Sequence, residues 1–264
     1  MNKQKSPSLL GGSMIIAGTA IGAGMLANPT AMSGIWFTGS VLLFLFIWGV
    51  TTLSALMLLE ANLHFEKGAN FDTITNELLG KSWNIINGIS VAFTLYILTY
   101  AYITSGGSIT ESLFQRFAPH LPINHTSAAL LFCLALALFV SISTKAVDRM
   151  STILIGGMVI AFFLSTTGLL TSAKSNILLN EVAQGNTTYL PYLLSAIPTC
   201  LVSFGYHICV PTLVNYYNKN GKKVTYAVLI GSLLALLIYI SWQMAVQGNL
   251  PRVEFAPIIE KGGD

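Results

Sequence analysis

Gly18-Thr19-Ala20-Ile21-Gly22-Ala23-Gly24-Met25 lies in the middle of the first apolar segment of the chain. A helix that crosses a bilayer must satisfy all of its own backbone hydrogen bonds, because lipid offers no partners. Gly22 and Gly24 favour an opening at mid-depth, because glycine tolerates non-helical backbone and leaves its peptide groups uncovered. Such an opening is tolerated only where it faces protein or a wet cavity. The stretch therefore predicts a broken helix and a candidate site for a small polar solute.

The same residues have a second interpretation. Small residues also let another transmembrane helix approach closely, as in contacts of the small-xxx-small type. This segment alone supports the two interpretations equally, and the rest of the chain has to decide between them.

The composition indicates an integral membrane protein, with the lipid bilayer as its surroundings. The chain has 264 residues, of which 53% are hydrophobic and 9% charged, and its mean hydropathy is +0.69. An average soluble domain carries about 25% charged residues, so this chain cannot cover a surface in water with polar groups. Its net charge of +3 is small, and we expect no nucleic-acid partner. The three cysteines lie in apolar stretches, and we expect neither a metal nor a cofactor.

Seven apolar segments are long enough, at about 20 residues, to cross the hydrocarbon core. None alternates like a barrel strand, so we predict an all-α polytopic membrane protein with a single transmembrane domain over residues 1–264. The connection 60–83 is polar and predicts a short surface helix near 70–77, whereas Gly106-Gly107 predicts the start of a loop over 106–126. The expected spans are residues 9–33, 36–59, 84–105, 127–144, 150–171, 190–215 and 224–247.

Positive charges predict the orientation, because cytoplasmic loops carry an excess of Lys and Arg. With a cytoplasmic N-terminus, nine cations lie inside and four outside. Glu111, His120 and His125 then fall in an outer loop as ordinary solvated residues. The inner cations are Lys3, Lys5, Lys67, Lys81, Lys145, Arg149, Lys219, Lys222 and Lys223, and the outer ones are Arg116, Lys174, Arg252 and Lys261.

The sixth apolar segment carries a second anomaly. Pro198 and Pro211 bracket Gly205, and proline inside a helix removes a hydrogen bond and clashes with the preceding turn. His207 lies beside this break, and an ionisable residue at membrane depth is a functional candidate. The alternative is a neutral histidine packed in the bundle against a carbonyl. The position beside a Gly/Pro break favours the functional interpretation.

The two anomalous segments are five helices apart. Many secondary transporters consist of two inverted repeats, and interrupted segments at matching places in the two halves mark their substrate site. The spacing therefore predicts a first five-helix repeat over about 9–171 and the start of a second over about 190–247.

Several motifs together resemble the bacterial aromatic amino acid permeases, and among them the tryptophan-specific members. Besides the stretch at 18–25, they are Ser-Leu-Leu-Gly-Gly at 8–12, Leu-Glu-Ala-Asn-Leu at 59–63, Phe-Asp-Thr-Ile-Thr at 71–75, Tyr-Ile-Leu-Thr-Tyr-Ala-Tyr at 96–102, Ser-Thr-Lys-Ala-Val at 143–147 and Ser-Phe-Gly-Tyr-His at 203–207. The resemblance runs along essentially the whole chain.

The resemblance implies a proton-driven symporter of the bacterial inner membrane that imports L-tryptophan, with the leucine-transporter type of inverted-repeat fold. Members of the family have about eleven spans, so we expect this chain to be an N-terminal portion in which the remainder of the fold is missing. A tyrosine or broad aromatic amino acid permease, or a truncated membrane protein without transport, are the alternatives. We expect no enzyme, because the spans contain no aspartate dyad, Ser/Lys pair or HExxH-like motif.

An amino acid needs a partner for each of its two charges in a low dielectric. We expect backbone N–H groups beyond the first break to meet the carboxylate, and carbonyls that end the helices before both breaks to meet the ammonium. The predicted substrate-binding residues at the breaks are Thr19, Ala20, Gly22, Ala23, Gly24, Met25, Ser203, Phe204, Gly205, Tyr206 and His207.

The aromatic side chain of the substrate needs a separate pocket. Tyr96 and Tyr100 are one turn apart and share a helix face. With the aromatic residues of the second break they could flank an aromatic ring, although Tyr100 also fits an interfacial belt. His207 and Gln243 are the candidate acceptors for an indole N–H. The candidates for proton coupling are Glu60 and His207, and Glu60 fits simple snorkelling at the inner end of the second span equally well.

Overall fold

The computed structural model describes residues 8–121, 123–142, 144–181 and 188–257, and every regular element within these ranges is helical. This confirms the predicted all-α class. The chain forms two compact units, Met1–Glu77 with Ala161–Asp264, and Leu78–Ile160. The single domain and the two repeats stay predictions.

Three helices are long and apolar enough to cross a membrane, by length and composition. They are Trp36–His64, Lys81–Phe117 and Gly221–Gln247. Four shorter apolar helices, Leu9–Gly22, His125–Ser141, Gly156–Ser172 and Leu190–Ser203, fall in the other four segments that the sequence predicts as spans.

The first expected span is interrupted, but later than the glycines suggest. Helix α1, Leu9–Gly24, begins at the cap Ser8, whose Oγ accepts a hydrogen bond from Gly11 N at 3.0 Å. It continues through Gly22 and ends at Gly24, and a turn over 25–27 leads into α2, Asn28–Ala31. The break therefore lies at the C-terminal edge of the predicted stretch 18–25 and not at the central glycines. Pro29 explains the actual position, because it lacks an N–H and cannot continue a helix that starts upstream.

The sixth expected span is interrupted where the sequence predicts it. Helix α9, Leu193–Ser203, ends one residue before Phe204, and α10, Cys209–Tyr216, begins after an irregular stretch over 204–208. Pro198 lies inside α9, and Pro211 lies in the first turn of α10. A proline in a first turn is tolerated because its N–H would have no helical partner there. Pro211 therefore suits a helix that starts anew.

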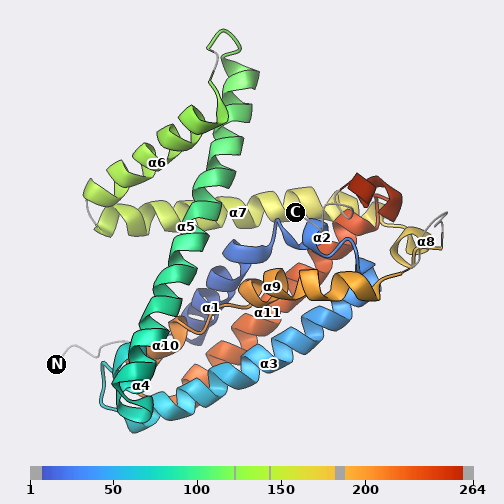
Figure 1. Ribbon diagram of the computed structural model, residues 1–264. Coiled ribbons are helices and arrows are strands. Elements are labelled where there is room, and N and C mark those ends of the chain that lie inside the picture. Colours follow the sequence, from blue (N-terminus) through green and yellow to red (C-terminus); the bar gives the residue numbers. More distant parts are fainter. Residues whose placement is uncertain (1–7, 122, 143, 182–187, 258–264) are drawn as a thin grey trace. The chain divides into compact units, whose positions relative to one another are not determined.

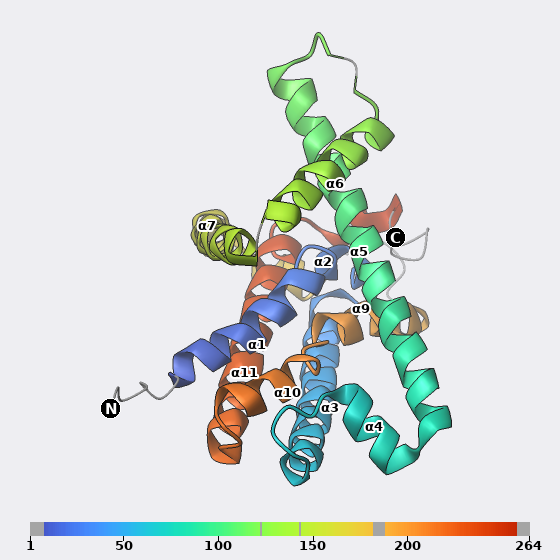
Figure 2. The same ribbon diagram turned by 90° about the vertical axis from the view of Figure 1, so that its left-hand side faces the viewer.

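Two long helices hold the interrupted segments in the first unit. These are α3, Trp36–His64, and α11, Gly221–Gln247, which pack against each other. Helix α1 packs along α11, and α9 and α10 pack on α3 (Figures 1 and 2). Helices α1 and α11 approach closely at Gly231, where a Cβ atom would lie 2.5 Å from Ser13 O. Shorter elements of this unit are α8, Ser175–Leu178, η1, Leu190–Tyr192, and η2, Arg252–Phe255.

The second unit corrects one sequence prediction. Helix α5, Lys81–Phe117, runs through Gly106 and Gly107, which were expected to begin a loop. The glycines belong to a helix contact, because a Cβ on Gly107 would lie 2.7 Å from Ala129 Cβ, in α6, His125–Ile142. Their small size therefore serves close packing. The short helix expected near 70–77 is present as α4, Phe71–Leu79, and α7, Thr144–Ser172, passes from this unit into the first.

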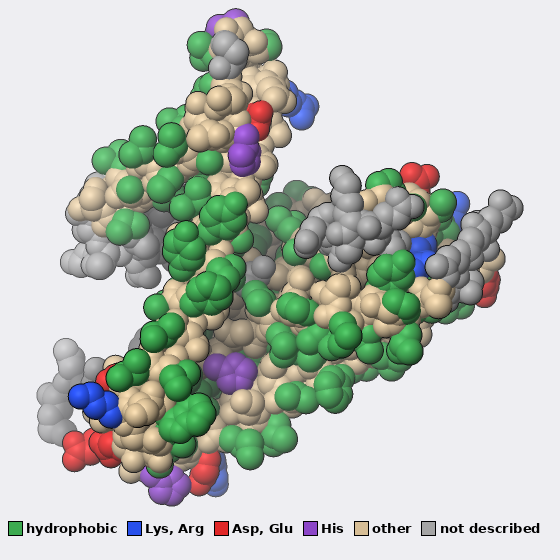
Figure 3. Space-filling view, viewed as in Figure 1, with side chains coloured by type: hydrophobic (Ala, Val, Ile, Leu, Met, Phe, Trp, Pro, Cys, Tyr) green, Lys and Arg blue, Asp and Glu red, His purple; other side chains and the backbone are tan. Residues whose placement is uncertain are grey.

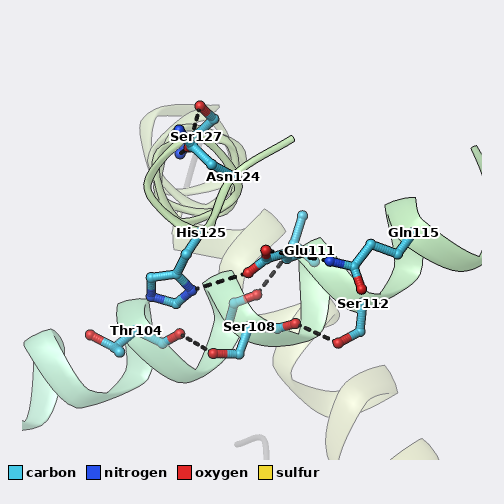
Figure 4. A network of polar contacts seen from close by, with 10 residues as sticks. Thr104, Ser108, Glu111, Ser112, Gln115, Asn124, His125 and Ser127 are labelled. Atoms are coloured by element: carbon cyan, nitrogen blue, oxygen red, sulfur yellow. Dashed lines mark hydrogen bonds and ion pairs between the residues drawn. The ribbon is translucent and has the colours of Figure 1, made fainter. Parts of the chain in front are cut away.

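The longer α5 also moves Glu111 out of the expected outer loop. Glu111 lies on α5, and His125 is the first residue of α6, with 3.5 Å between Glu111 Oε2 and His125 Nδ1 (Figure 4). His120 remains in the connection between the two helices, as predicted. The Glu111–His125 pair therefore joins the facing ends of α5 and α6.

Apolar side chains cover much of the visible surface along the helices, whereas charged side chains gather near helix ends and connections (Figure 3). Many of the exposed side chains are large, including Phe46, Leu53 and Met57 on α3 and Phe93 on α5. Exposed apolar surface on this scale is typical of proteins that contact a membrane.

Candidate functional site

The two interrupted segments lie side by side and antiparallel within the first unit. Residue numbers rise along one segment as they fall along the other at every point of contact. The contacts are Ser8 O with Tyr217 Oη at 2.8 Å, Thr19 Oγ1 with Cys209 Sγ at 3.2 Å, Gly24 with Ser203, and Gly34 with Tyr192. The two breaks are therefore neighbours, although about 180 residues of chain separate them.

Gly24 and Ser203 form the contact between the ends of α1 and α9. A Cβ atom on Gly24 would overlap Ser203 Oγ and would lie 2.8 Å from Ser203 Cα. The Ser203 hydroxyl lies 2.9 Å from Asn28 Oδ1, on α2, and 2.8 Å from Thr199 O. Only glycine therefore allows this approach, and the serine connects the end of α9 to the helix that follows the first break.

Tyr239, on α11, joins the two breaks from a third helix. Its hydroxyl donates to Ala20 O at 2.6 Å and to Ser203 O at 2.8 Å, so one proton is shared between two acceptors. Ser203 is the last residue of α9, and its carbonyl has no partner further along the helix. Tyr239 is fully buried, and its ring stacks on Phe44 at 5.7 Å between centroids. The hydroxyl thus occupies carbonyls at both breaks.

The aromatic residues of the second break lie in the core of the first unit. Phe204 is fully buried and meets the Tyr239 ring edge-on at 5.3 Å. Tyr206 is also fully buried, and its hydroxyl lies 2.9 Å from Thr52 Oγ1 on α3. Its ring stacks on the ring of His207 at 5.5 Å, and His207 is half-buried. These contacts anchor the irregular backbone over 204–208.

A row of polar side chains on α11 continues from Tyr239. Gln243 and Gln247 follow at intervals of four residues, so the three share one helix face, and all three are fully buried. Gln243 Nε2 donates to Ser40 Oγ at 2.9 Å, and Gln247 Nε2 donates to Pro29 O at 3.3 Å. Sequence analysis singled out Gln243 alone. The four-residue spacing of polar residues on an otherwise apolar helix is the signal that could have added the other two.

Comparison with known proteins identifies the family. Residues 5–264 match the tryptophan/tyrosine permease family. The chain belongs to this family. Its relatives include the tryptophan-specific transport proteins of Haemophilus influenzae, 64% identical over the whole chain, and of Pseudomonas aeruginosa, 51% identical over 98% of it. The tyrosine permease of Enterobacter agglomerans is 39% identical over 99%.

This permease chain spans 64%, 62% and 63% of the lengths of these three relatives, which is less than two thirds in each case. No solved structure matches it. The family and the apolar helices together indicate a multi-pass membrane protein. The resemblance on which the sequence predictions rest is confirmed.

Other predicted site residues lie elsewhere along the chain. Tyr96 and Tyr100 lie on α5 in the second unit, with 70% and 64% of their surfaces exposed. Glu60 is exposed near the C-terminal end of α3. Thr19 lies within α1 and contacts Cys209, Met25 begins the turn that follows α1, and the side chain of Ala23 is outside the described residues.

The buried polar side chains of the permease are uncharged throughout the described ranges. Its cations in the first unit lie near the ends of the long helices. Lys219 Nζ donates to Phe65 O at 2.7 Å, next to the end of α3, whereas Arg252 Nη2 donates to Gly34 O at 2.9 Å, before α3 begins. The neighbourhood of the breaks is therefore polar but neutral, with dipoles in place of charges.

Proposed function

We propose that this permease imports L-tryptophan together with protons across the bacterial inner membrane, and that the substrate binds where the two breaks meet. The antiparallel pairing of the interrupted segments, with Gly24 against Ser203, is the observation that carries the proposal. Broken helices that meet near the middle of a membrane offer backbone dipoles to both ends of an amino acid. The names of two close relatives support tryptophan as the substrate.

The neutral surroundings of the breaks fit a zwitterion. A buried charged ligand must find a partner for each charge, and a site without side-chain charge accepts a net-neutral molecule at the lowest cost. We assign the carboxylate to N–H groups near Gly24 and Met25. We assign the ammonium to carbonyls near Thr19 and Ser203, although the hydroxyl of Tyr239 already uses part of this acceptor capacity.

Selectivity for an aromatic side chain is assigned to Phe204 and Tyr206, and Tyr96 and Tyr100 on α5 remain candidates for the same role. Aromatic rings prefer edge-to-face and offset-stacked partners, which these residues can supply. His207 or Gln243 would accept the indole N–H. Glu60 and His207 remain the candidates for the proton carrier.

An inverted repeat of the leucine-transporter type fits the packing of the first unit. Each interrupted segment is followed along the chain by a long unbroken helix, α3 in the first case and α11 in the second. The packing is reciprocal, because α1 packs on α11 whereas α9 and α10 pack on α3. Each interrupted segment thus packs on the long helix that follows the other one, and this arrangement supports two related repeats. The distribution of cations supports a cytoplasmic N-terminus.

Competition uptake tests the substrate. Cells that express the complete coding region take up radiolabelled L-tryptophan in the presence of excess unlabelled tryptophan, tyrosine, phenylalanine or leucine. We expect tryptophan to compete most strongly and leucine not at all. Stronger competition by tyrosine would instead support the alternative that the relative from Enterobacter agglomerans suggests.

An imposed pH difference tests the coupling ion. We expect accumulation to follow an inward proton gradient and to stop when an ionophore collapses it. Accumulation that follows a sodium gradient at constant pH would reject proton coupling.

A further inference from the structure

Three buried amide groups beside the first break have polar atoms without a hydrogen-bond partner in the described part of the chain. These atoms are Gln243 Oε1, Gln247 Oε1 and Asn28 Nδ2. The two glutamines are fully buried and Asn28 is 1% exposed. Buried polar groups are nearly always hydrogen-bonded, so each exception requires an explanation.

The orientation of both glutamine amides is determined by their neighbours. Ser40 Oγ uses its single proton on Trp36 O, at 2.5 Å, so it can only accept from Gln243 Nε2. Pro29 O is an acceptor only, so it requires Gln247 Nε2. In both side chains the free atom is therefore the carbonyl oxygen, and the two oxygens belong to residues one helical turn apart on α11.

We propose that Gln243 and Gln247 bind the α-ammonium of the substrate, and that Asn28 Nδ2 donates to its carboxylate. This inference rests on the proposed function. An ammonium carries three N–H donors and can bond both free oxygens at once, whereas an indole ring carries one. Under this assignment Gln243 binds the ammonium, and His207 is left as the acceptor for the indole N–H. The Tyr239 hydroxyl already occupies the carbonyls of Ala20 and Ser203, so the ammonium needs further acceptors.

Asn28 lies on α2, the short helix after the first break, whereas the two glutamines lie on α11. Its Oδ1 lies 2.9 Å from Ser203 Oγ, which links it to the end of α9, and α2 packs against α11. A free donor on α2 and free acceptors on the helix that packs against it match the two ends of an amino acid.

A set of tryptophan analogues tests the proposal, because each removes one polar group. Displacement of radiolabelled L-tryptophan by L-tryptophan, tryptamine, indole-3-propionate and 1-methyl-L-tryptophan is measured in membranes that contain the complete gene product. Tryptamine lacks the carboxylate, indole-3-propionate lacks the amine and 1-methyl-L-tryptophan lacks the indole N–H.

We expect Gln243→Met and Gln247→Met each to weaken binding of L-tryptophan and tryptamine by about tenfold, the factor for one lost hydrogen bond of a charged group. Binding of indole-3-propionate should change by less than about twofold. Asn28→Leu should show the opposite selectivity, with loss for L-tryptophan and indole-3-propionate but not for tryptamine. Gln243→Leu, which is also close to glutamine in volume and has no amide, should repeat the Gln243→Met result.

Gln115→Met is the matched control, because Gln115 lies on α5 near Glu111 and outside the first unit. It should leave all affinities unchanged. Equal loss of every analogue in the glutamine variants would show that these residues only pack the helices and would overturn the proposal. A loss that disappears for 1-methyl-L-tryptophan would assign the glutamines to the indole and also overturn it. A wild-type protein that binds none of the four probes would contradict the proposed function itself, and the inference with it.

Discussion

The two interruptions of the first unit meet in space, but different residues produce them. In the first segment Gly22 and Gly24 are helical, and the helix stops only at 25–27, ahead of Pro29. In the second segment Gly205 itself lies in the irregular stretch, and Pro211 lies in the first turn of the new helix. In both segments a proline stands just inside the helix that resumes.

This comparison separates the roles of the two residue types. Pro29 and Pro211 mark where a helix resumes, because proline lacks a donor and its ring clashes with a preceding turn, whereas α9 continues past Pro198. Glycine can allow another part of the chain to approach closely, as Gly24 does for Ser203 and Gly107 does for Ala129. Gly18 meets nothing within 4 Å and has neither role.

The largest expected effect comes from Gly24→Leu, which forces the two breaks apart. We expect uptake of tryptophan to fall by at least about 100-fold, because a shift of about 1 Å in a binding site can have that effect. Membrane insertion, followed by immunoblotting of the membrane fraction, should persist. Gly18→Leu on the same helix is the control and should retain uptake. Normal uptake by Gly24→Leu would show that the breaks are not part of the substrate site.

Tyr239→Phe removes the hydroxyl that both interruptions share. We expect a loss of about 1–3 kcal/mol in the free energy of unfolding, since the buried carbonyls of Ala20 and Ser203 lose a donor. Thermal unfolding in detergent measures this loss. Tyr226→Phe, on an exposed face of the same helix, should unfold like the wild type. Equal behaviour of the two variants would argue that the hydroxyl is not a link between the breaks.

Gly107→Ala tests whether a glycine in an unbroken helix serves packing. We expect the close contact with Ala129 to cost about 1–3 kcal/mol of stability, as overpacking usually does. Gly88→Ala, on the same helix with open space around it, should gain up to about 1 kcal/mol from helix propensity. Thermal unfolding of the two variants shows whether each substitution raises or lowers the stability. A gain in stability in both variants would contradict close packing at Gly107.

Thr52→Val has the smallest expected effect, because it touches only the second interruption. The Tyr206 hydroxyl would lose its bond to Thr52, at a cost of about 1 kcal/mol. Thr99→Val removes a hydroxyl that bonds only within its own exposed helix, and it serves as the control. The two melting temperatures should differ by a few degrees. No difference would mean that Thr52 does not anchor the break.

Much of the fold could be predicted from local sequence. Apolar segments of sufficient length located the helices, and Pro198 and Pro211 located the second interruption, because helix formation and proline chemistry act over a few residues. The first break and the Gly106-Gly107 pair were misplaced for one reason. A glycine can either open a helix or let another helix pack closely against it. Which of the two applies depends on a residue that is distant in the sequence, Ser203 for Gly24 and Ala129 for Gly107.

The sequence by itself determined that this is an all-helical membrane protein of an aromatic amino acid permease type with two anomalous segments. Hydropathy and motifs are properties of neighbouring residues, so they need no structure. Only the tertiary structure decided that the segments run antiparallel with their breaks in contact. It alone showed that Tyr239 reaches both breaks, and that the amides of Asn28, Gln243 and Gln247 are buried together beside the first. Those relations depend on the packing of α11 against α1, α2 and α3, which no local pattern specifies.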